Sequence, residues 1–315
     1  MANFVDVTNL TYEGEYAKEI FIKNLYESKL KSFGITYMPG VKGKQQLVSG
    51  DVSDLFQKFT CPFSASGEAE LTEKWIEGVP MKVNLEQCYD SFWSTFLAAQ
   101  TEVSLNGGVP QAFFDWFFNG VLVPELSREY EQIFWNGDKA AGATDTLKIA
   151  DGIVKQLNAD TKVNKVNKVT GAVLTVDNIL AQVEAVALKA MDAATETEME
   201  DYKLFMNVND FRLLKVALSK EAILGDQVWA NFGRDGEKIY AFGFEVVPCL
   251  IAKNTMVLAP AKNLVLGYDI ADSEISYKMI DMRQTTLDNT FRVGVITNIA
   301  IGYVYPELIV VSKPA

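Results

Sequence analysis

Apolar residues recur every three or four positions in several parts of the chain, which is the spacing of amphipathic helices. The first such part, residues 15–33, places Ile22 and Tyr26 on one side and is followed by Gly34, a helix stop. A second helix is predicted over residues 86–100. The segment between these two helices has a different pattern.

The longest predicted helix runs from Pro110 to Asn136, with Gly137 at the stop position. Its apolar stripe consists of large, mostly aromatic side chains: Phe113, Trp116, Phe117, Val121, Tyr130, Ile133, Phe134 and Trp135. At about 1.5 Å per residue the helix would span roughly 40 Å. We expect the stripe to pack in a core. Because Pro124 lacks an N–H group, a bend is expected over residues 122–125.

Residues 35–85 are rich in turns and charges, and their apolar positions alternate. Met81, Val83 and Leu85 alternate with polar residues, as in a strand with one apolar face. A long two-stranded projection is predicted here, with residues 40–45 at its mobile tip. Because isolated two-stranded ribbons are marginally stable in water, such a projection would need a neighbouring surface.

The remainder of the chain mixes both patterns. A helix is predicted over residues 175–191, a strand over residues 202–208, and a second helix capped by Asn209 or Asp210. The dipeptide Asp235-Gly236 predicts a hairpin turn. Three strands are expected near the C-terminus, at residues 276–282, 290–301 and 307–311. We expect these last strands to return to the long helix.

Composition excludes several classes of function. The chain has 315 residues, 49% of them hydrophobic, so it can bury one large or two moderate cores. Its formal charge of −12 argues against a nucleic-acid reader, which needs a basic surface. The absence of histidine excludes Ser-His-Asp and Cys-His triads and imidazole metal ligands. Carboxylate-only metal sites and carboxylate pairs remain possible, but nothing in the sequence picks one out, so we predict no enzyme activity, no cofactor and no metal site.

The cysteines and the acidic residues offer no specific site. Cys61, Cys88 and Cys249 are widely spaced and include no Cys-x-x-Cys pair, so buried reduced thiols are expected. Residues 196–201 are acidic but lack the spacing of a calcium loop, and are interpreted as a solvated face. No apolar run is long enough to cross a bilayer, and residues 1–6 lack signal-peptide features, so synthesis inside a cell is expected.

Several motifs, taken in order, resemble a known family. They are Gly243-Phe244-Glu245-Val246-Val247-Pro248, then Lys262-Asn263-Leu264-Val265-Leu266-Gly267, then Asp288-Asn289-Thr290-Phe291-Arg292-Val293, and the closing strand Leu308-Ile309-Val310-Val311. This order resembles the C-terminal part of the major capsid proteins of tailed double-stranded-DNA bacteriophages, which have the HK97-like fold. The segments Glu131–Asp138 and Asp151–Val154 are similar to the family's passage from a spine helix into an inserted domain.

The resemblance implies an α+β chain with the HK97-like capsid fold: an N-terminal arm, an extended β-hairpin loop, a long spine helix in a peripheral domain, and an inserted axial domain. It places the arm at residues 1–34, the extended loop at 35–85, the peripheral domain at 86–138 and 256–315, and the axial domain at 139–255. The resemblance also implies that arm and loop contact neighbouring subunits. The candidates for such contacts are Ile22, Tyr26, Lys42, Lys44, Gln45 and Trp75.

The function that the resemblance implies is structural. We expect the chain to self-assemble into pentamers and hexamers of an icosahedral phage head that encloses double-stranded DNA without sequence-specific contacts. The expected location is the virion capsid, assembled in the host cytoplasm without a membrane. Further expected partners are portal and decoration proteins and a scaffolding protein, which the initiator Met1 favours as a separate chain. Two alternatives remain: an encapsulin-type nanocompartment shell protein, and an enzyme with a divalent ion on carboxylates such as Asp281 and Asp288.

Overall fold

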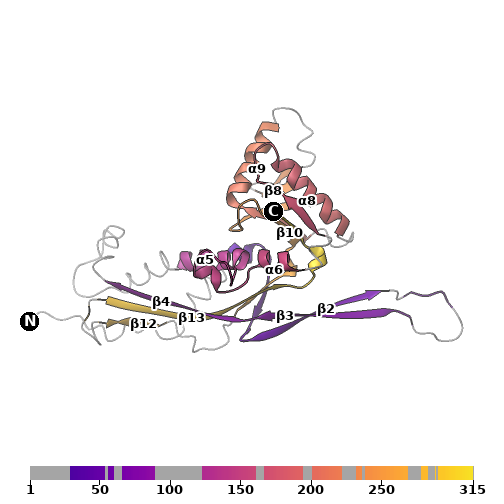
Figure 1. The fold of residues 1–315 in the computed structure, drawn as a ribbon. Helices are drawn as coiled ribbons and strands as arrows, with labels where there is room; N and C mark the ends of the chain where they lie inside the picture. Colours follow the sequence, from indigo (N-terminus) through magenta and orange to yellow (C-terminus); the bar gives the residue numbers. More distant parts are fainter. Residues whose placement is uncertain are drawn as a thin grey trace, which may run out of the picture.

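The computed structural model describes residues 29–53, 56–59, 66–88, 123–160, 167–193, 201–221, 232–235, 238–268, 278–282, 288 and 290–314. These residues form an elongated base, a hairpin that extends from the base, and an upper unit that rises from its middle (Figure 1). Among them, no helix is long and apolar enough to cross a membrane.

The base is a five-stranded sheet built around β13, Thr290–Tyr303. β13 pairs antiparallel with β4 (Val79–Cys88), β11 (Leu264–Tyr268) and β12 (Lys278–Asp281), while β1 (Thr36–Pro39) lies parallel to β11. Buried Val293 and Val295 alternate with exposed Arg292 and Ile296, so the strand has one covered face. At about 3.3 Å per residue, β13 spans about 45 Å.

The upper unit contains a seven-stranded mixed sheet in the order β5-β14-β10-β6-β9-β8-β7. Its strands are β5 (Lys168–Gly171), β6 (Tyr202–Asn207), β7 (Phe232–Asp235), β8 (Lys238–Ala241), β9 (Phe244–Cys249), β10 (Met256–Pro260) and β14 (Val310–Pro314). β7 and β8 pair antiparallel from Asp235↔Lys238 onward, so the predicted hairpin is present.

Helices cover both faces of this sheet. One face is covered by α8 (Ile179–Ala193) and α9 (Val208–Glu221), and the other by α5 (Val123–Asn136) and α6 (Ile153–Ala159). Because successive strand side chains point to opposite faces, β6 contributes to both cores. Leu204 and Met206 pack with α8 and α9, whereas Phe205 packs on Trp135 of α5, with ring centroids 5.0 Å apart.

The start of α9 differs from the prediction. Asn207, not Asn209 or Asp210, caps it: the Asn207 Oδ1 accepts a hydrogen bond from the backbone N–H of Asn209 at 2.9 Å. Asp210 is buried and accepts a hydrogen bond from the backbone N–H of Asn254 at 2.7 Å. The side chains predicted to face inward, Phe211, Leu214 and Leu218, are buried.

The predicted projection is shorter than expected. A separate two-stranded ribbon consists of β2 (Lys44–Ser53) and β3 (Glu68–Glu77) alone. The alternating segment Met81–Leu85 is a strand as predicted, but as part of β4 it pairs with β13 in the base. Residues 40–43 lie at the root of the ribbon and not at its tip, because β1 and β2 pair with different sheets.

Two further predictions concern the long helix and the last strand. The helix is described as α5 from Val123 onward, while Phe113, Trp116, Phe117, Val121 and most of the expected bend lie outside the described residues. The described part of the stripe, from Tyr130 to Trp135, is buried as predicted. The last strand, β14, pairs with β10 and β5 in the upper sheet and not with the base, while its Val311 lies in the same buried cluster as Phe134 and Trp135 of the long helix.

Candidate assembly surface

The root of the β2–β3 ribbon is fixed to the base by a small apolar cluster. Its buried members are Val41, Leu47, Ile76, Val265 and Ala300. Ile76 lies against Gly302 of β13, where an added Cβ would lie 2.4 Å from the Ile76 Cγ2 atom. Only glycine therefore allows β3 to approach β13 this closely. The ribbon leaves the base in a fixed direction and not as a loose loop.

A polar contact next to this cluster strengthens the attachment. The Lys74 ammonium lies 3.8 Å from the Asp160 carboxylate and 2.9 Å from the centre of the Tyr303 ring. The Tyr303 hydroxyl donates a hydrogen bond to Asp160 at 2.8 Å. Burial, and then the hydrogen bond to Asp160, raise the pKa of Tyr303. Strand β3, the end of α6 and β13 thus meet at one point.

Beyond its root, the ribbon exposes an apolar row on one face. Leu71, Trp75 and Val48 are 71%, 57% and 56% exposed. The register pairs Gln46 with Trp75, Val48 with Glu73, and Gly50 with Leu71, so the three apolar side chains lie on the same face of the two strands. We call Val48, Leu71 and Trp75 the hairpin stripe. In Figure 1 the ribbon extends away from the base and the upper unit.

The turn that joins the two strands carries further apolar surface. Among its described residues, 56–59 and 66–67, Phe56 and Phe59 are 101% and 89% exposed. A two-stranded ribbon with one exposed apolar row and two exposed aromatic rings has little within its own chain to stabilise it. Such a surface is typical of a segment that binds another molecule.

The predicted contact residues fall in different places. Trp75 lies in the hairpin stripe, while Lys42 is exposed at the ribbon root. Lys44 and Gln45 begin β2 opposite Glu77 and Ile76, also at the root. Ile22 and Tyr26 lie outside the described residues. Whether any of these residues contacts a second subunit stays a prediction.

Sequence reasoning missed Val48, Leu71, Phe56 and Phe59. The alternation of Leu71 with Trp75 was a usable signal, since it places both on one face of a strand. Val48 could not be found without the strand register, because a shift of one residue would place it on the opposite face.

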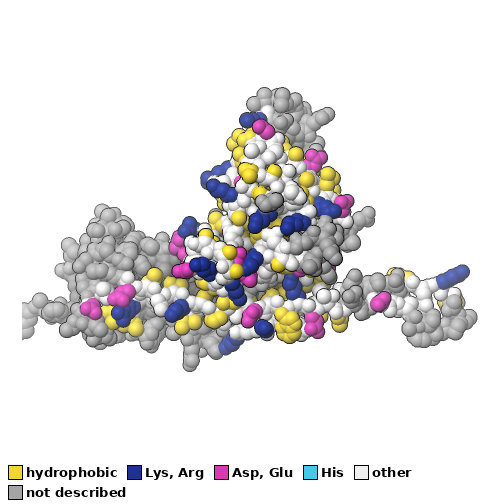
Figure 2. Space-filling model, viewed as in Figure 1, with side chains coloured by type: hydrophobic (Ala, Val, Ile, Leu, Met, Phe, Trp, Pro, Cys, Tyr) yellow, Lys and Arg dark blue, Asp and Glu magenta, His cyan; other side chains and the backbone are white. Residues whose placement is uncertain are grey.

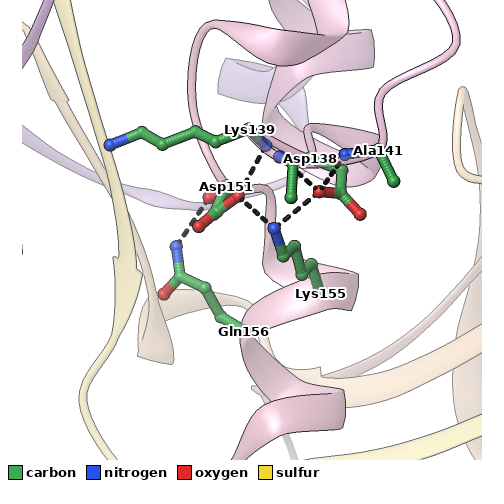
Figure 3. Close-up of polar contacts among 7 residues, drawn as sticks. Asp138, Lys139, Ala141, Asp151, Lys155 and Gln156 are labelled. Carbon is green, nitrogen blue, oxygen red and sulfur yellow. Dashed lines mark hydrogen bonds and ion pairs between the residues drawn. The ribbon is translucent and has the colours of Figure 1, made fainter.

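Figure 3 shows a second fixed junction, between α5 and α6. Lys155 donates hydrogen bonds to Asp138 at 2.6 Å and to Asp151 at 2.8 Å. Asp138 also accepts the backbone N–H groups of Ala140 and Ala141, and Asp151 accepts that of Lys139. The bond from Lys155 is the main reason why the pKa of Asp138 falls to about 2, and the pKa of Lys155 is raised.

The backbone at this junction is also close-packed. The Gly152 N–H donates to the Gly137 carbonyl at 2.8 Å, and a Cβ on Gly152 would lie 2.6 Å from the Gly137 nitrogen. Gln156 donates to the carbonyls of Asp151 and Ile301, at 2.7 and 3.0 Å. The two sequence motifs that resemble the passage into an inserted domain, one at each glycine, therefore meet here and hold α5, α6 and β13 together.

The same helix end is attached to the upper sheet. Glu131 is buried and accepts the backbone N–H of Leu250 at 2.8 Å. Asn136 donates to the Leu250 carbonyl at 2.6 Å and accepts the N–H of Ala252 at 2.7 Å. The side chains of Glu131 and Asn136 therefore hold the end of α5 against the chain segment that follows β9.

A groove of about 380 Å³ lies between α5 and the sheet of the base. Its walls are mostly apolar and include Met81, Val83, Tyr130, Ile133 and Val295.

In the described part of the chain, no three His, Cys, Asp or Glu residues gather as metal ligands. Cys249 is buried and reduced, as predicted, and burial raises its pKa well above the ordinary value. The side chains of Cys61 and Cys88 lie outside the described residues.

Comparison with known proteins gives a result for structure and not for sequence. No protein-family model matches the chain. No curated protein matches it either.

Solved structures are similar over nearly the whole chain. A chain of the satellite phage P4 procapsid including its size determination (Sid) protein matches with a TM-score of 0.60 and 12% identity, and the match covers 93% of this chain and 97% of that one. A chain of Gordonia phage Cozz matches with a TM-score of 0.52, 13% identity, and coverage of 91% and 86%. A chain from the capsid of the empty GTA particle has a TM-score of 0.53, 9% identity, and coverage of 91% and 90%. The fold class predicted from the sequence motifs is thus confirmed: the chain has the α+β, HK97-type fold of these phage capsid structures.

Proposed function

We propose that the chain is the major capsid protein of a tailed double-stranded-DNA phage, a structural protein that self-assembles into pentamers and hexamers of an icosahedral head. The fold supports this function, because the similar solved structures are phage procapsids and capsids. The role is one of subunit geometry and not of catalysis. The acidic net charge of −12 suits an inner wall that does not bind the enclosed DNA tightly.

The observation that carries the proposal is the β2–β3 ribbon. It is rigidly attached at Ile76 and Lys74, yet its outer face exposes the hairpin stripe to solvent. A segment whose root is rigid and whose far end is apolar suits a contact with a second molecule at a defined position. In a shell, that molecule is the adjacent copy of the same chain.

We further propose which part of the subunit forms each domain of the capsid fold. The base with α5 acts as the peripheral domain, the upper unit as the axial domain, and the ribbon as the extended loop. The predicted division ended the axial domain at residue 255 and returned the chain to the peripheral domain at residue 256. Because β10 and β14 belong to the upper sheet, the sheet pairing supports an axial domain that also includes these two strands. Portal, scaffolding and decoration proteins are the expected further partners, and the virion capsid is the expected location.

Expression of the full chain and electron microscopy of the purified protein test the proposal. Closed shells or their hexameric and pentameric units are the expected result. A monomer that fails to assemble at high concentration, with or without a co-expressed scaffolding protein, would contradict it. Particles that contain a protein cargo and no DNA after infection or co-expression would show a nanocompartment shell in place of a phage head.

A further inference from the structure

The outer face of α8 is acidic and apolar. Helical spacing places Glu184, Leu188, Met191 and Asp192 on the side opposite the buried core positions. Leu188 is 56% exposed and Met191 is 42% exposed. We call these four residues the α8 face. On its flank, the Lys189 ammonium lies 3.8 Å from the Asp192 carboxylate, an exposed ion pair of the kind that contributes little to stability.

The outer face of α9 is basic and apolar. Arg212, Lys215, Val216 and Lys220 are all exposed and lie opposite the buried positions of the same helix. Val216 is 49% exposed. We call these four residues the α9 face. The Lys215 ammonium lies over the Phe211 ring, 4.7 Å from its centre, in a cation–π contact.

The two helices share one face of the upper sheet and lie at different places along it. α8 packs over β5, β14 and β10 and also contacts β8, whereas α9 packs over β6 and β9. In the view of Figure 1, α9 lies on the left of the upper unit and α8 on the right, and Figure 2 shows Lys and Arg together with hydrophobic side chains on the left and acidic, hydrophobic and a few basic ones on the right. One subunit therefore presents an acidic and a basic helix surface at two different places on the upper unit.

We propose that the α8 face of one subunit docks against the α9 face of a second copy, in a head-to-tail contact that repeats from subunit to subunit. A contact between two different surfaces of identical chains closes into a ring when the rotation that relates neighbouring subunits is a whole fraction of 360°. The inference rests on the proposed capsid function and names the surfaces that join the upper units within one pentamer or hexamer.

The chemistry of the two faces supports this contact. Leu188 and Met191 would cover Val216, while Glu184 and Asp192 would meet the Arg and Lys side chains around it. Asp192 lies in the last turn of α8, which has no basic residue, and the helix dipole disfavours a negative charge there. A basic face on the adjacent subunit would offset that local cost.

Charge reversal of one face at a time tests the contact in the full-length protein. Glu184→Lys with Asp192→Lys, or Arg212→Glu with Lys215→Glu, should raise the protein concentration needed for assembly by about tenfold or more. The combination of all four changes restores opposite charges and should restore assembly. Asp145→Lys, at an exposed carboxylate beside the base, is the matched control and should leave assembly unchanged.

A cysteine pair locates the contact directly. The double variant Leu188→Cys with Val216→Cys should form disulfides between subunits on mild oxidation, giving a ladder of covalent oligomers in non-reducing gels. Each single variant should not give that ladder.

The results separate this inference from the proposed function. If shells form and neither charge reversal nor the cysteine pair has an effect, the α8–α9 contact is refuted while the capsid function stands. If the wild-type protein never assembles, both are refuted. Rescue by the fourfold charge swap supports the contact, because a loss of folding would not be restored by two further changes.

Discussion

The sharpest prediction concerns the hairpin stripe. Replacement of Val48, Leu71 and Trp75 by serine removes the exposed apolar row and leaves the buried root residues Leu47 and Ile76 in place. The ribbon should keep its attachment to the base. The change is therefore expected to affect contacts between subunits far more than the stability of one subunit.

The magnitude follows from the exposed fractions. Complete burial of one large apolar side chain stabilises by about 1.5–3 kcal/mol. Between 56% and 71% of each of the three side chains is exposed in the single chain. If a neighbouring subunit covers that part, each contributes about 1–2 kcal/mol, and the three together about 3–6 kcal/mol per contact. The triple variant should then need roughly a hundredfold or more higher concentration to assemble.

The assay combines light scattering for assembly with thermal unfolding of the unassembled subunit. Val173→Ser is a control, because Val173 is 64% exposed and lies outside the ribbon. An unchanged melting temperature with a large loss of assembly is the expected result for the triple variant. Normal assembly by the triple variant would refute the argument that the ribbon binds a neighbour.

Three further predictions concern the two rigid junctions. Ile76→Ala should destabilise the subunit by about 2–5 kcal/mol, because Ile76 is 1% exposed at the ribbon root; a loss below about 1 kcal/mol in chemical denaturation would contradict that placement. Gly152→Ala should lower the melting temperature, since its Cβ would lie 2.6 Å from the Gly137 nitrogen; an unchanged melting temperature would show that the backbone can move apart. The Asp138 pKa of about 2 lies below its unfolded value of about 3.9, so the bond to Lys155 stabilises the fold above about pH 4 and is lost as the pH falls towards 2. Lys155→Met should therefore reduce the drop in melting temperature between about pH 6 and pH 2.5, and an equal drop in both proteins would count against this role.

Local patterns predicted much of the fold. The alternation in Met81–Leu85, the helical spacing around Leu214 and the Asp235-Gly236 turn each gave the element that is observed. These features depend on neighbours in sequence, where spacing and turn chemistry decide the structure. The fold class was predicted from the order of the motifs along the chain, because no single motif identifies it.

Pairing between distant segments could not be predicted in the same way. The residues of β4 fit a strand in any sheet, and only the long partner β13 explains why they lie in the base. The turn at Gly40 and Gly43 was read as a tip because it is rich in glycine, but Val41 between them is 1% exposed and anchors the root. The α8 and α9 faces became visible only when the structure showed which side of each helix packs on the upper sheet.

The central claim is that the ribbon binds a neighbouring copy of the chain. A cryo-electron microscopy reconstruction of the assembled particle tests it most directly. We expect the hairpin stripe at Val48, Leu71 and Trp75 to lie on an adjacent subunit, with little of its surface exposed to solvent. A closed particle in which the ribbon projects freely, with all three side chains in solvent, would contradict the account.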